Sequence, residues 1–505
     1  MIKKLIRQAP SSAGLRTGKQ GKPKNNKLVS DYFEEKGLPI QPALTFDDVQ
    51  IINNISDISS RSDIKNLKTP LSRSFFLNIP IVSANMDTVT DARMAIGLAR
   101  LGGLGFIHQF FPLEQRITEV MKVKRADNAL IEDPFTILYS ASFKNAKEKM
   151  EKNGVSSLLV IDERHHLKGI FTSRDYRFRT DGNLLVSKIM KSMPLITALP
   201  GISRKEAERI LEENRIEKLP IVDKNGLLRG LITAKDILKE KEFPNAIKDT
   251  KGRLAVGVAL RLNSDYVDEA KKLVAVGADV LLLDTARAGS TMVGEAVKKI
   301  KKAFPKITLI AGNIDTPEEV EFLAKAGADC LKVGIGPGAA CKTQEETGVG
   351  LPQIYAVSSC AAMAKKIGVY IIADGGIRNG ACLAKALVAG SNAVMIGSLL
   401  AGTDEAPGIL LKKGNQLWKV YRGSASFEHQ LDRMKTGSLD AIRNPEGESG
   451  LIPYSGSVKS VLDGLVGGLR SSMSYVGARD LGEFWKKGKF VWRTNAGRDE
   501  GKPRV

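Results

Sequence analysis

The 505-residue sequence contains few cysteines, few histidines and no long apolar run. Its four cysteines include no C-x-x-C pair, so we expect free thiols in a reducing, cytoplasmic setting, with neither a disulfide scaffold nor a structural zinc site. No run approaches the roughly 18 apolar residues of a membrane-spanning helix. The patterns H-E-x-x-H, G-x-S-x-G and Walker A are absent, which excludes zincins, α/β-hydrolases and P-loop enzymes.

Positive charge exceeds negative charge, and part of the excess lies at the N-terminus. The formal net charge is +20, and the segment before Asp31 has lysines and arginines but no acidic residue. Residues 1–40 are polar and non-periodic, so we predict a flexible basic tail and lead-in without the apolar region of a secretory signal. No basic stretch is interleaved with aromatic residues, so we expect no specific nucleic-acid partner and no membrane partner.

Short apolar runs alternate with amphipathic helical patterns between Gly252 and Ser398. Such an alternation indicates βαβ units around a parallel sheet. Together with two candidate strands before residue 110, the runs predict an α/β fold, a (β/α)8 barrel formed by residues 41–127 and 248–505. The runs are "LAVGVAL", "DVLLLD", "ITLIAGN", "CLKVGIG", "VYIIADGG" and "AVMIGS".

An internal repeat interrupts the predicted barrel after its second strand. "LLVIDERHHLKGIFTSRD" (158–175) matches "LPIVDKNGLLRGLITAKD" (219–236) in register. The repeat resembles a tandem pair of CBS domains, a Bateman module, with the first domain at 130–183 and the second at 188–243. The resemblance implies that adenine or guanine nucleotides bind the module, and the alternative is a structural module that binds no ligand. The implied nucleotide-binding residues are Thr172, Asp175, Thr233 and Asp236.

Chemistry in such a barrel is expected on the loops that follow the strands. Asp374-Gly375-Gly376 follows the seventh predicted strand, and Gly397-Ser398 follows the eighth. Adjacent glycines let backbone N–H groups approach an anion, which suits a phosphomonoester, and the Asp374 carboxylate suits vicinal ribose hydroxyls. Each glycine pair taken alone is equally consistent with an ordinary turn.

The loop after the sixth predicted strand reads "GIGPGAACKTQEETGVGLPQ" (334–353) and contains the best candidate for a nucleophile. A cysteine among exposed backbone amides can have a stabilised thiolate, so Cys341 is that candidate, and Thr343 is placed to pass a proton. The alternative is that Cys341 is only a small residue where bulk does not fit.

From about residue 40 to 497 the sequence resembles the IMP dehydrogenase / GMP reductase family. The motifs that carry the resemblance include "LTFDDVQII", "SANMDTVT", "LLLDTARAGS", "KVGIGPGAACKTQ", "IADGGIR" and "GGLRSSMSYVGA". The resemblance implies that Cys341 attacks C2 of IMP, that hydride leaves for NAD+, and that water hydrolyses a covalent thioimidate to give XMP. The implied catalytic residues are Cys341, Thr343, Arg433 and Glu446, and the implied substrate-binding residues are Ser83, Asn313, Asp374, Gly376, Gly397, Ser398 and Tyr421.

The resemblance also implies cofactors and an assembly. NAD+ is expected against Asp284, Gly334, Ile335 and Gly336, with NADPH in its place for a reductase. Backbone carbonyls of Gly336, Gly338 and Cys341 are expected to bind K+, since a hard cation prefers oxygen ligands. The expected assembly is a homotetramer or an octamer.

The sequence departs from the pattern of the dehydrogenases in several places. Ala339 replaces a serine of the loop, and the flap has Arg433 followed by Met434 instead of an Arg-Tyr pair. Glu446 with Thr343 resembles a proton relay of the family, and such a pair without Arg-Tyr resembles the arrangement of GMP reductase. We therefore expect an IMP dehydrogenase and keep two alternatives, a GMP reductase and a nucleotide-binding paralogue with impaired catalysis.

Overall fold

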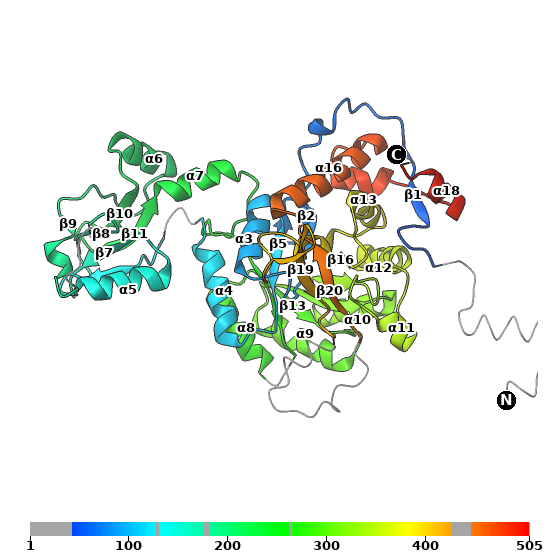
Figure 1. The fold of residues 1–505 in the computed structure, drawn as a ribbon. Helices are drawn as coiled ribbons and strands as arrows, with labels where there is room; N and C mark the ends of the chain where they lie inside the picture. Colours follow the sequence, from blue (N-terminus) through cyan, green and yellow to red (C-terminus); the bar gives the residue numbers. More distant parts are fainter. Residues whose placement is uncertain (1–42, 128–130, 176–181, 263–264, 427–445, 504–505) are drawn as a thin grey trace, which may run out of the picture. The chain divides into compact units, whose positions relative to one another are not determined.

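The structure is a computed structural model that describes residues 43–127, 131–175, 182–262, 265–426 and 446–503 (Figure 1). The predicted basic tail, residues 1–40, lies outside the described residues. In the part of the chain that is described, no helix is long and apolar enough to cross a membrane.

Eight parallel strands form a closed barrel, in the order β12-β13-β14-β15-β16-β17-β4-β5. The prediction of a (β/α)8 barrel is therefore confirmed, and the six apolar runs after Gly252 supply six of its strands. The strands are β4 (Ile81–Ser83), β5 (Leu104–Ile107), β12 (Gly257–Leu260), β13 (Val280–Asp284), β14 (Thr308–Ile314), β15 (Cys330–Val333), β16 (Tyr370–Asp374) and β17 (Ala393–Ile396).

Amphipathic helices cover the outside of the barrel, and their ends follow local sequence signals. Thr316 and Glu319 form a capping box at the start of α10 (Pro317–Ala326), and Gly327 ends that helix with a left-handed φ of 110°. The other barrel helices are α3 (Ala92–Leu101), α4 (Leu113–Arg125), α8 (Tyr266–Ala275), α9 (Thr291–Ala303), α12 (Gln353–Ile367) and α13 (Gly380–Val388), and α16 (Val458–Val476) packs on α13.

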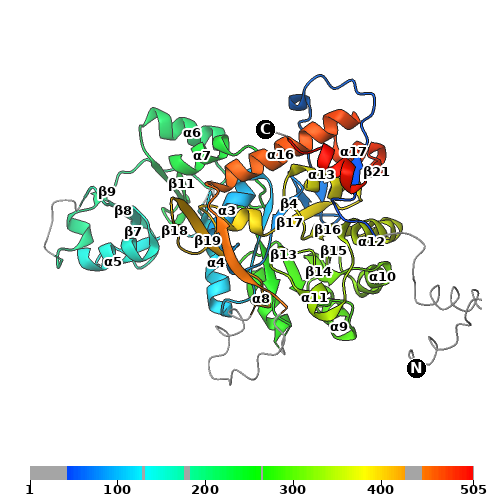
Figure 2. The same ribbon diagram turned by 45° about the vertical axis from the view of Figure 1, so that its right-hand side comes forward.

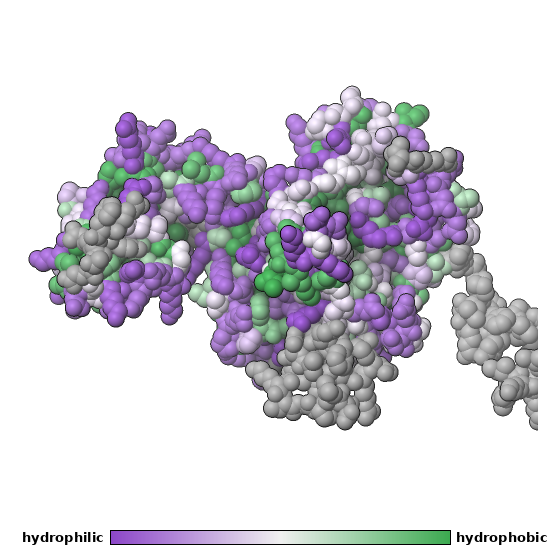
Figure 3. All heavy atoms as spheres, in the orientation of Figure 1, coloured by the Kyte–Doolittle hydropathy of each residue, from purple (hydrophilic) through white to green (hydrophobic). Residues whose placement is uncertain are grey.

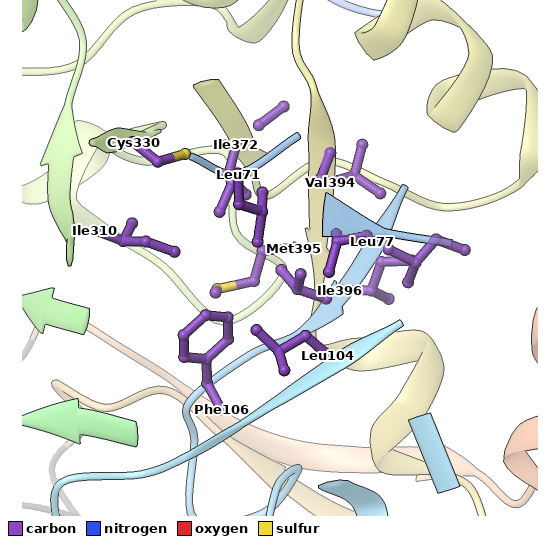
Figure 4. Packing of buried hydrophobic residues seen from close by; sticks show 14 of the residues in the cluster. Leu71, Leu77, Leu104, Phe106, Ile310, Cys330, Ile372, Val394, Met395 and Ile396 are labelled. Carbon is purple, nitrogen blue, oxygen red and sulfur yellow. The ribbon is translucent and has the colours of Figure 1, made fainter. Parts of the chain in front are cut away.

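The interior of the barrel is filled by apolar side chains. Figure 4 shows Phe106 and Met395 meeting inside the barrel, with Leu104 and Ile310 nearby. A Cβ atom at Gly257 would lie 2.4 Å from the Phe106 ring, so the glycine makes room for that ring. The barrel is thus a packed core, and the space for a ligand lies at its rim.

The segment between α4 and β12 contains two β-hairpins of the same design. The hairpin of β7 (Ser157–Ile161) and β8 (Leu167–Thr172) shifts register between Val160 and Ile161. The hairpin of β10 (Lys218–Val222) and β11 (Leu228–Thr233) shifts register at the equivalent point, between Ile221 and Val222. The segment also contains β6 (Thr136–Leu138), β9 (Lys191–Ser192), α5 (Phe143–Asn153), α6 (Arg204–Glu213) and α7 (Ala234–Glu242).

The two hairpins share a hydrophobic cluster. Leu159, Ile161 and Leu167 from the first hairpin pack with Leu228 and Leu231 from the second. Each repeat therefore buries apolar surface against the other, as expected of a unit that cannot complete its core alone.

An antiparallel sheet lies beside the barrel. It consists of β18 (Leu411–Lys413), β19 (Gln416–Arg422) and β20 (Ser449–Pro453), and Figure 2 shows it in front of the barrel strands. Figure 3 shows hydrophobic residues gathered over this sheet, where Leu410, Leu417, Val420 and Leu451 are 41–45% exposed.

Two short strands join distant parts of the chain. β1 (Val49–Ile51) pairs in antiparallel fashion with β21 (Phe490–Trp492), which lies between α17 (Leu481–Lys487) and α18 (Asn495–Glu500).

Candidate active site

A cavity of about 500 Å³ opens at the rim where the barrel strands end. Each of its walls follows a different strand, as expected for a barrel of this class. The lining includes Asn85 after β4, Asp284 at the end of β13, Asn313 in β14, the loop Gly334–Cys341 after β15, Asp374–Gly376 at β16, and Gly397 and Ser398 after β17. Most of the predicted site residues therefore share one cavity.

Cys341 begins a short chain of hydrogen bonds in this cavity. Its side chain is exposed, and its Sγ donates to Thr343 Oγ1 at 3.3 Å. Thr343 Oγ1 in turn donates to Glu446 Oε2 at 2.7 Å. The thiol, the hydroxyl and the carboxylate thus form a path along which a proton can leave the sulfur.

Backbone contacts hold this path together. The Lys342 N–H donates to the Glu446 carbonyl at 2.8 Å, and Cys341 forms a β-bridge with Gly447. Arg433, the other predicted base, lies outside the described residues.

A buried lysine that the sequence reasoning missed connects the two ribose-binding candidates. Lys332 in β15 is 3% exposed, and its Nζ lies 2.6 Å from Asp374 Oδ2 and 2.8 Å from Asp284 Oδ1. It also donates to Asn313 Oδ1. Burial alone would lower the pKa of this ammonium, but the carboxylates of Asp284 and Asp374 outweigh burial and raise it. A charged residue inside the apolar run "CLKVGIG" was the signal that could have identified it.

Two asparagines orient the same carboxylates. Asn85 Nδ2 donates to Asp284 Oδ2 at 2.9 Å, and Asn313 Nδ2 donates to Asp374 Oδ2 at 3.0 Å. Both carboxylates are therefore held in place as hydrogen-bond acceptors at the rim of the barrel, where hydroxyl groups of a ligand could reach them.

Gly375, Gly376 and Gly397 form a wall of the cavity where a ligand could contact the backbone directly. Gly375 and Gly376 have positive φ values of 96° and 75°, which favour glycine. A Cβ atom at Gly397 would lie 2.8 Å from the Tyr421 hydroxyl. Tyr421 is 8% exposed, and burial raises the pKa of its phenol, so it stays a neutral donor.

Ser83 is placed differently from the other predicted substrate residues. It is fully buried in β4, and its hydroxyl accepts from Thr90 Oγ1 at 2.8 Å. It is not among the residues that line the cavity, which its neighbours Ala84 and Asn85 reach.

The predicted cofactor and cation residues lie on the Cys341 loop. Gly334, Ile335 and Gly336 line the cavity. Gly334 has a φ of 141°, and a Cβ atom there would lie 2.1 Å from the Asp374 carbonyl, so both the conformation and the space favour glycine. The Gly338 carbonyl accepts from the Cys341 N–H at 3.0 Å. Backbone carbonyls suit a hard monovalent cation, and among the described residues no cluster of three or more His, Cys, Asp or Glu offers a different metal site.

In the inserted segment each predicted threonine contacts its own aspartate. Thr172 Oγ1 donates to Asp175 Oδ2 at 2.8 Å, and Thr233 Oγ1 donates to Asp236 Oδ2 at 2.5 Å. Thr233 also caps α7. Burial raises the pKa of Asp236. The two pairs share the hydroxyl-to-carboxylate hydrogen bond but differ in their backbone contacts, since the Thr172 N–H donates to Asp175 Oδ2 at 2.6 Å whereas the Asp236 N–H donates to Thr233 Oγ1 at 3.2 Å.

Comparisons with known proteins agree with this architecture. Residues 43–504 match the family model of the IMP dehydrogenase / GMP reductase domain. The chain is 44% identical over 473 residues to the inosine-5'-monophosphate dehydrogenase of Nitrosopumilus maritimus, covering 92% of this chain and 99% of that one. It is 46% identical over 464 residues to the enzyme of the same name from Aquifex aeolicus, covering 91% and 94%.

Two solved structures of Trypanosoma brucei GMP reductase are also similar. A variant in complex with guanosine 5'-monophosphate superposes with a TM-score of 0.87 at 38% identity, covering 93% of this chain and 99% of that one. The enzyme in complex with guanosine 5'-triphosphate gives a TM-score of 0.78 at 36% identity, covering 91% and 100%.

Proposed function

This chain belongs to the IMP dehydrogenase / GMP reductase family of oxidoreductases, and we propose that it oxidises IMP to XMP with NAD+. The observation that carries the proposal is the chain of hydrogen bonds from Cys341 through Thr343 to Glu446. These three residues line the same cavity as Asp374. A hydroxyl that connects a thiol to a carboxylate provides a way to activate the thiol as a nucleophile, and we propose that the Asp374 carboxylate in the same cavity binds the ribose.

In the proposed reaction, the Cys341 proton passes to Thr343 and on to Glu446, and the thiolate forms a bond to C2 of IMP. The electron pair of the C2–H bond leaves as hydride, for which bound NAD+ supplies the acceptor. Glu446 then gives the proton received from Cys341 to solvent. Water adds to C2 of the cysteine-bound purine, and the proton of the water passes through Thr343 to Glu446. The C2–S bond breaks, the Cys341 sulfur takes the second proton back from Glu446 through Thr343, and XMP leaves. The balance is therefore IMP, NAD+ and water to XMP, NADH and a proton.

The substrate would lie with its ribose hydroxyls on Asp374, supported by Asn313. Its phosphate would accept hydrogen bonds from Gly376, Gly397 and Ser398 N–H groups and from the Tyr421 hydroxyl. Ser83 would support this wall from behind through Thr90.

Asp284 would bind the nicotinamide ribose, beside Gly334, Ile335 and Gly336. The carbonyls of Gly336, Gly338 and Cys341 would bind K+, which would fix the conformation of the loop that presents the thiol.

GMP reductase is the second candidate, because the Thr343–Glu446 contact is equally compatible with that reaction. In that reaction the Cys341 thiolate would displace ammonia from C2 of GMP, and the relay would deliver a proton to the leaving nitrogen. NADPH would then supply hydride to C2, and the C2–S bond would break with its electron pair returning to Cys341, which releases IMP. The described proton path serves either direction, because it connects the sulfur to a carboxylate in both.

For the inserted segment we propose a tandem CBS module, 130–183 and 188–243, that binds adenine or guanine nucleotides through Thr172, Asp175, Thr233 and Asp236. Calorimetry with ATP, ADP, AMP and GTP tests this site, and Thr233→Val with Asp236→Asn should abolish the heat. We also propose a homotetramer in the cytoplasm, where the four free thiols would stay reduced.

A two-substrate assay decides between the two reactions. Purified protein with IMP and NAD+ should generate NADH, measured by absorbance, and Cys341→Ala should abolish it. Ammonia release from GMP with NADPH, and no NADH from IMP, would establish the reductase instead. Comparing Arg433→Ala with Glu446→Gln identifies the base that acts on water, since only the working base should reduce turnover strongly.

A further inference from the structure

The loop that carries Cys341 begins and ends against one buried carboxylate. Asp315 follows β14 directly and is 3% exposed. Its Oδ1 accepts from the Ile335 N–H at 2.9 Å, and its Oδ2 accepts from the Leu351 N–H at 2.9 Å. One side chain therefore binds both ends of the segment 335–351.

A second side chain binds the opposite sides of the same two residues. Gln344 lies within the loop, in the short helix α11 (Thr343–Thr347), and its Nε2 donates to the Ile335 carbonyl at 2.9 Å and to the Leu351 carbonyl at 3.4 Å. Ile335 and Leu351 thus give their N–H groups to Asp315 and their carbonyls to Gln344.

Two glycines make room for this arrangement. A Cβ atom at Gly336 would lie 2.2 Å from Gln344 Cγ, and one at Gly350 would lie 2.7 Å from the same atom. Both glycines have positive φ values, 100° and 127°. The backbone beside each clamped residue is therefore shaped to admit the Gln344 side chain.

The charged group nearest to the buried Asp315 carboxylate does not stabilise it, because that group is another carboxylate. The neighbouring carboxylate, Glu319 in α10, accepts from the Asp315 N–H at 2.9 Å and so lies close with the same sign of charge. A buried carboxylate with a like charge beside it is costly unless its oxygens accept hydrogen bonds. The two loop N–H groups supply these bonds, so the energetics of Asp315 depend on the loop being closed.

We propose that Asp315 and Gln344 are positioning residues that clamp the ends of the 335–351 loop and so aim Cys341 and Thr343, a role that rests on the proposed function of Cys341 as nucleophile. Neither side chain needs to touch the substrate. Loss of these hydrogen bonds would let the 335–351 loop change position. The Cys341 thiol would then no longer be aligned with Thr343 and Glu446.

The test uses the full chain and four single variants. Asp315→Asn keeps the size but replaces one acceptor with a donor that opposes a loop N–H. Gln344→Glu keeps the size but removes both donors, and Gln344→Ala removes the side chain. Glu345→Gln, an exposed change on the same short helix, is the matched control.

We expect the Asp315 variant and both Gln344 variants to reduce kcat for IMP oxidation about 10- to 100-fold. The calorimetric Kd for IMP should change less than about threefold, and the double variant Asp315→Asn with Gln344→Ala should be no worse than the poorer single variant. Glu345→Gln should match the unmodified protein. A kcat within twofold in Gln344→Glu, or equal losses in kcat and IMP affinity, would overturn the clamp. Because Gln344 is exposed, its variants remain informative if Asp315→Asn fails to fold.

Alkylation of Cys341 by iodoacetamide gives a readout that needs no substrate. The other three cysteines are buried, and Cys341→Ser measures their background. The clamp variants should be alkylated at least fivefold more slowly, because the thiol loses its path to Glu446; an unchanged or faster rate refutes the clamp. If the unmodified protein makes no NADH from IMP, the proposed function fails, yet the alkylation rates still decide on the clamp.

Discussion

Lys332 allows the sharpest test of how the rim of the barrel is stabilised. Its ammonium lies between the carboxylates of Asp284 and Asp374 and is 3% exposed. Lys332→Met keeps most of the apolar stem and removes the charge, which leaves two carboxylates facing each other in a buried setting. Removing one partner of a buried ion pair costs about 3–5 kcal/mol, so we expect the free energy of unfolding to fall by that amount.

Urea unfolding followed by tryptophan fluorescence measures this loss in the barrel alone. The three tryptophans, Trp418, Trp485 and Trp492, all lie outside the inserted segment. Lys325→Met is the matched control, since Lys325 is 73% exposed in its pair with Glu321 and should contribute less than about 1 kcal/mol.

A second substitution separates charge from packing. Adding Asp284→Asn to Lys332→Met removes one of the two uncompensated carboxylates, so it should restore part of the lost stability. A loss below about 1 kcal/mol in Lys332→Met, or a further additive loss in the double variant, would refute the idea that electrostatics holds this site together.

Three further predictions follow from the site. Glu446→Gln should reduce turnover about 100-fold, because Glu446 receives the proton. The Kd for IMP, measured by calorimetry, should change little, because Glu446 is not proposed to bind the nucleotide. A parallel loss of IMP affinity would contradict the relay. Gly397→Ala places a methyl group 2.8 Å from the Tyr421 hydroxyl and should weaken IMP binding about tenfold in the same calorimeter, whereas equal affinity would exclude a phosphate at this wall. Burial raises the pKa of Asp315 to about 7, so the folded state binds this proton more tightly than the unfolded state does. Relative to Asp315→Asn, the free energy of unfolding of the unmodified protein should therefore rise by about 1 kcal/mol per pH unit as pH falls from about 7 to about 4. Urea titrations at several pH values measure this difference, and a pH-independent difference would contradict the shift.

Much of the fold was predictable because its signals are local. Buried parallel strands read as apolar runs, and each is followed by an amphipathic helix with its own cap, as Thr316 and Glu319 illustrate. The candidate site followed from the same logic, since the strand ends of a parallel barrel meet at one rim. Cys341, Asp374 and Gly397 line the cavity for that reason.

The residues that sequence reasoning missed act through partners far away in the chain. Lys332 is one charged residue in an apolar run, and its role depends on Asp284 and Asp374, which precede and follow it by more than 40 residues. In the sequence, Asp315 has the position of a residue that precedes a helix. In the structure, its carboxylate accepts hydrogen bonds from the Ile335 and Leu351 N–H groups. Pairings of this kind depend on tertiary geometry, which periodicity does not encode.

Ser83 is a predicted site residue that does not line the cavity. It ends the first barrel strand, and the sequence therefore places it at the rim with the other site residues. The strand β4 ends at Ser83, so Asn85 belongs to the loop that follows it. The structure turns Ser83 toward Thr90 and presents Asn85, two residues later, to the cavity.

The register of the barrel explains why a lysine can serve two carboxylates. Lys332 pairs with Gly312 on one side and Ile372 on the other, so its Cα lies two residues below the level of Asp374 in β16. The four-carbon stem crosses this distance and brings the ammonium to the rim. A Cβ atom at Gly312 would lie 2.5 Å from the Lys332 Cβ, so the glycine in the neighbouring strand leaves the space that the stem needs. Four adjacent strands therefore contribute to one arrangement, formed by Asp284, Gly312, Lys332 and Asp374. In it, the two carboxylates proposed to bind substrate and cofactor share the positive charge of one lysine.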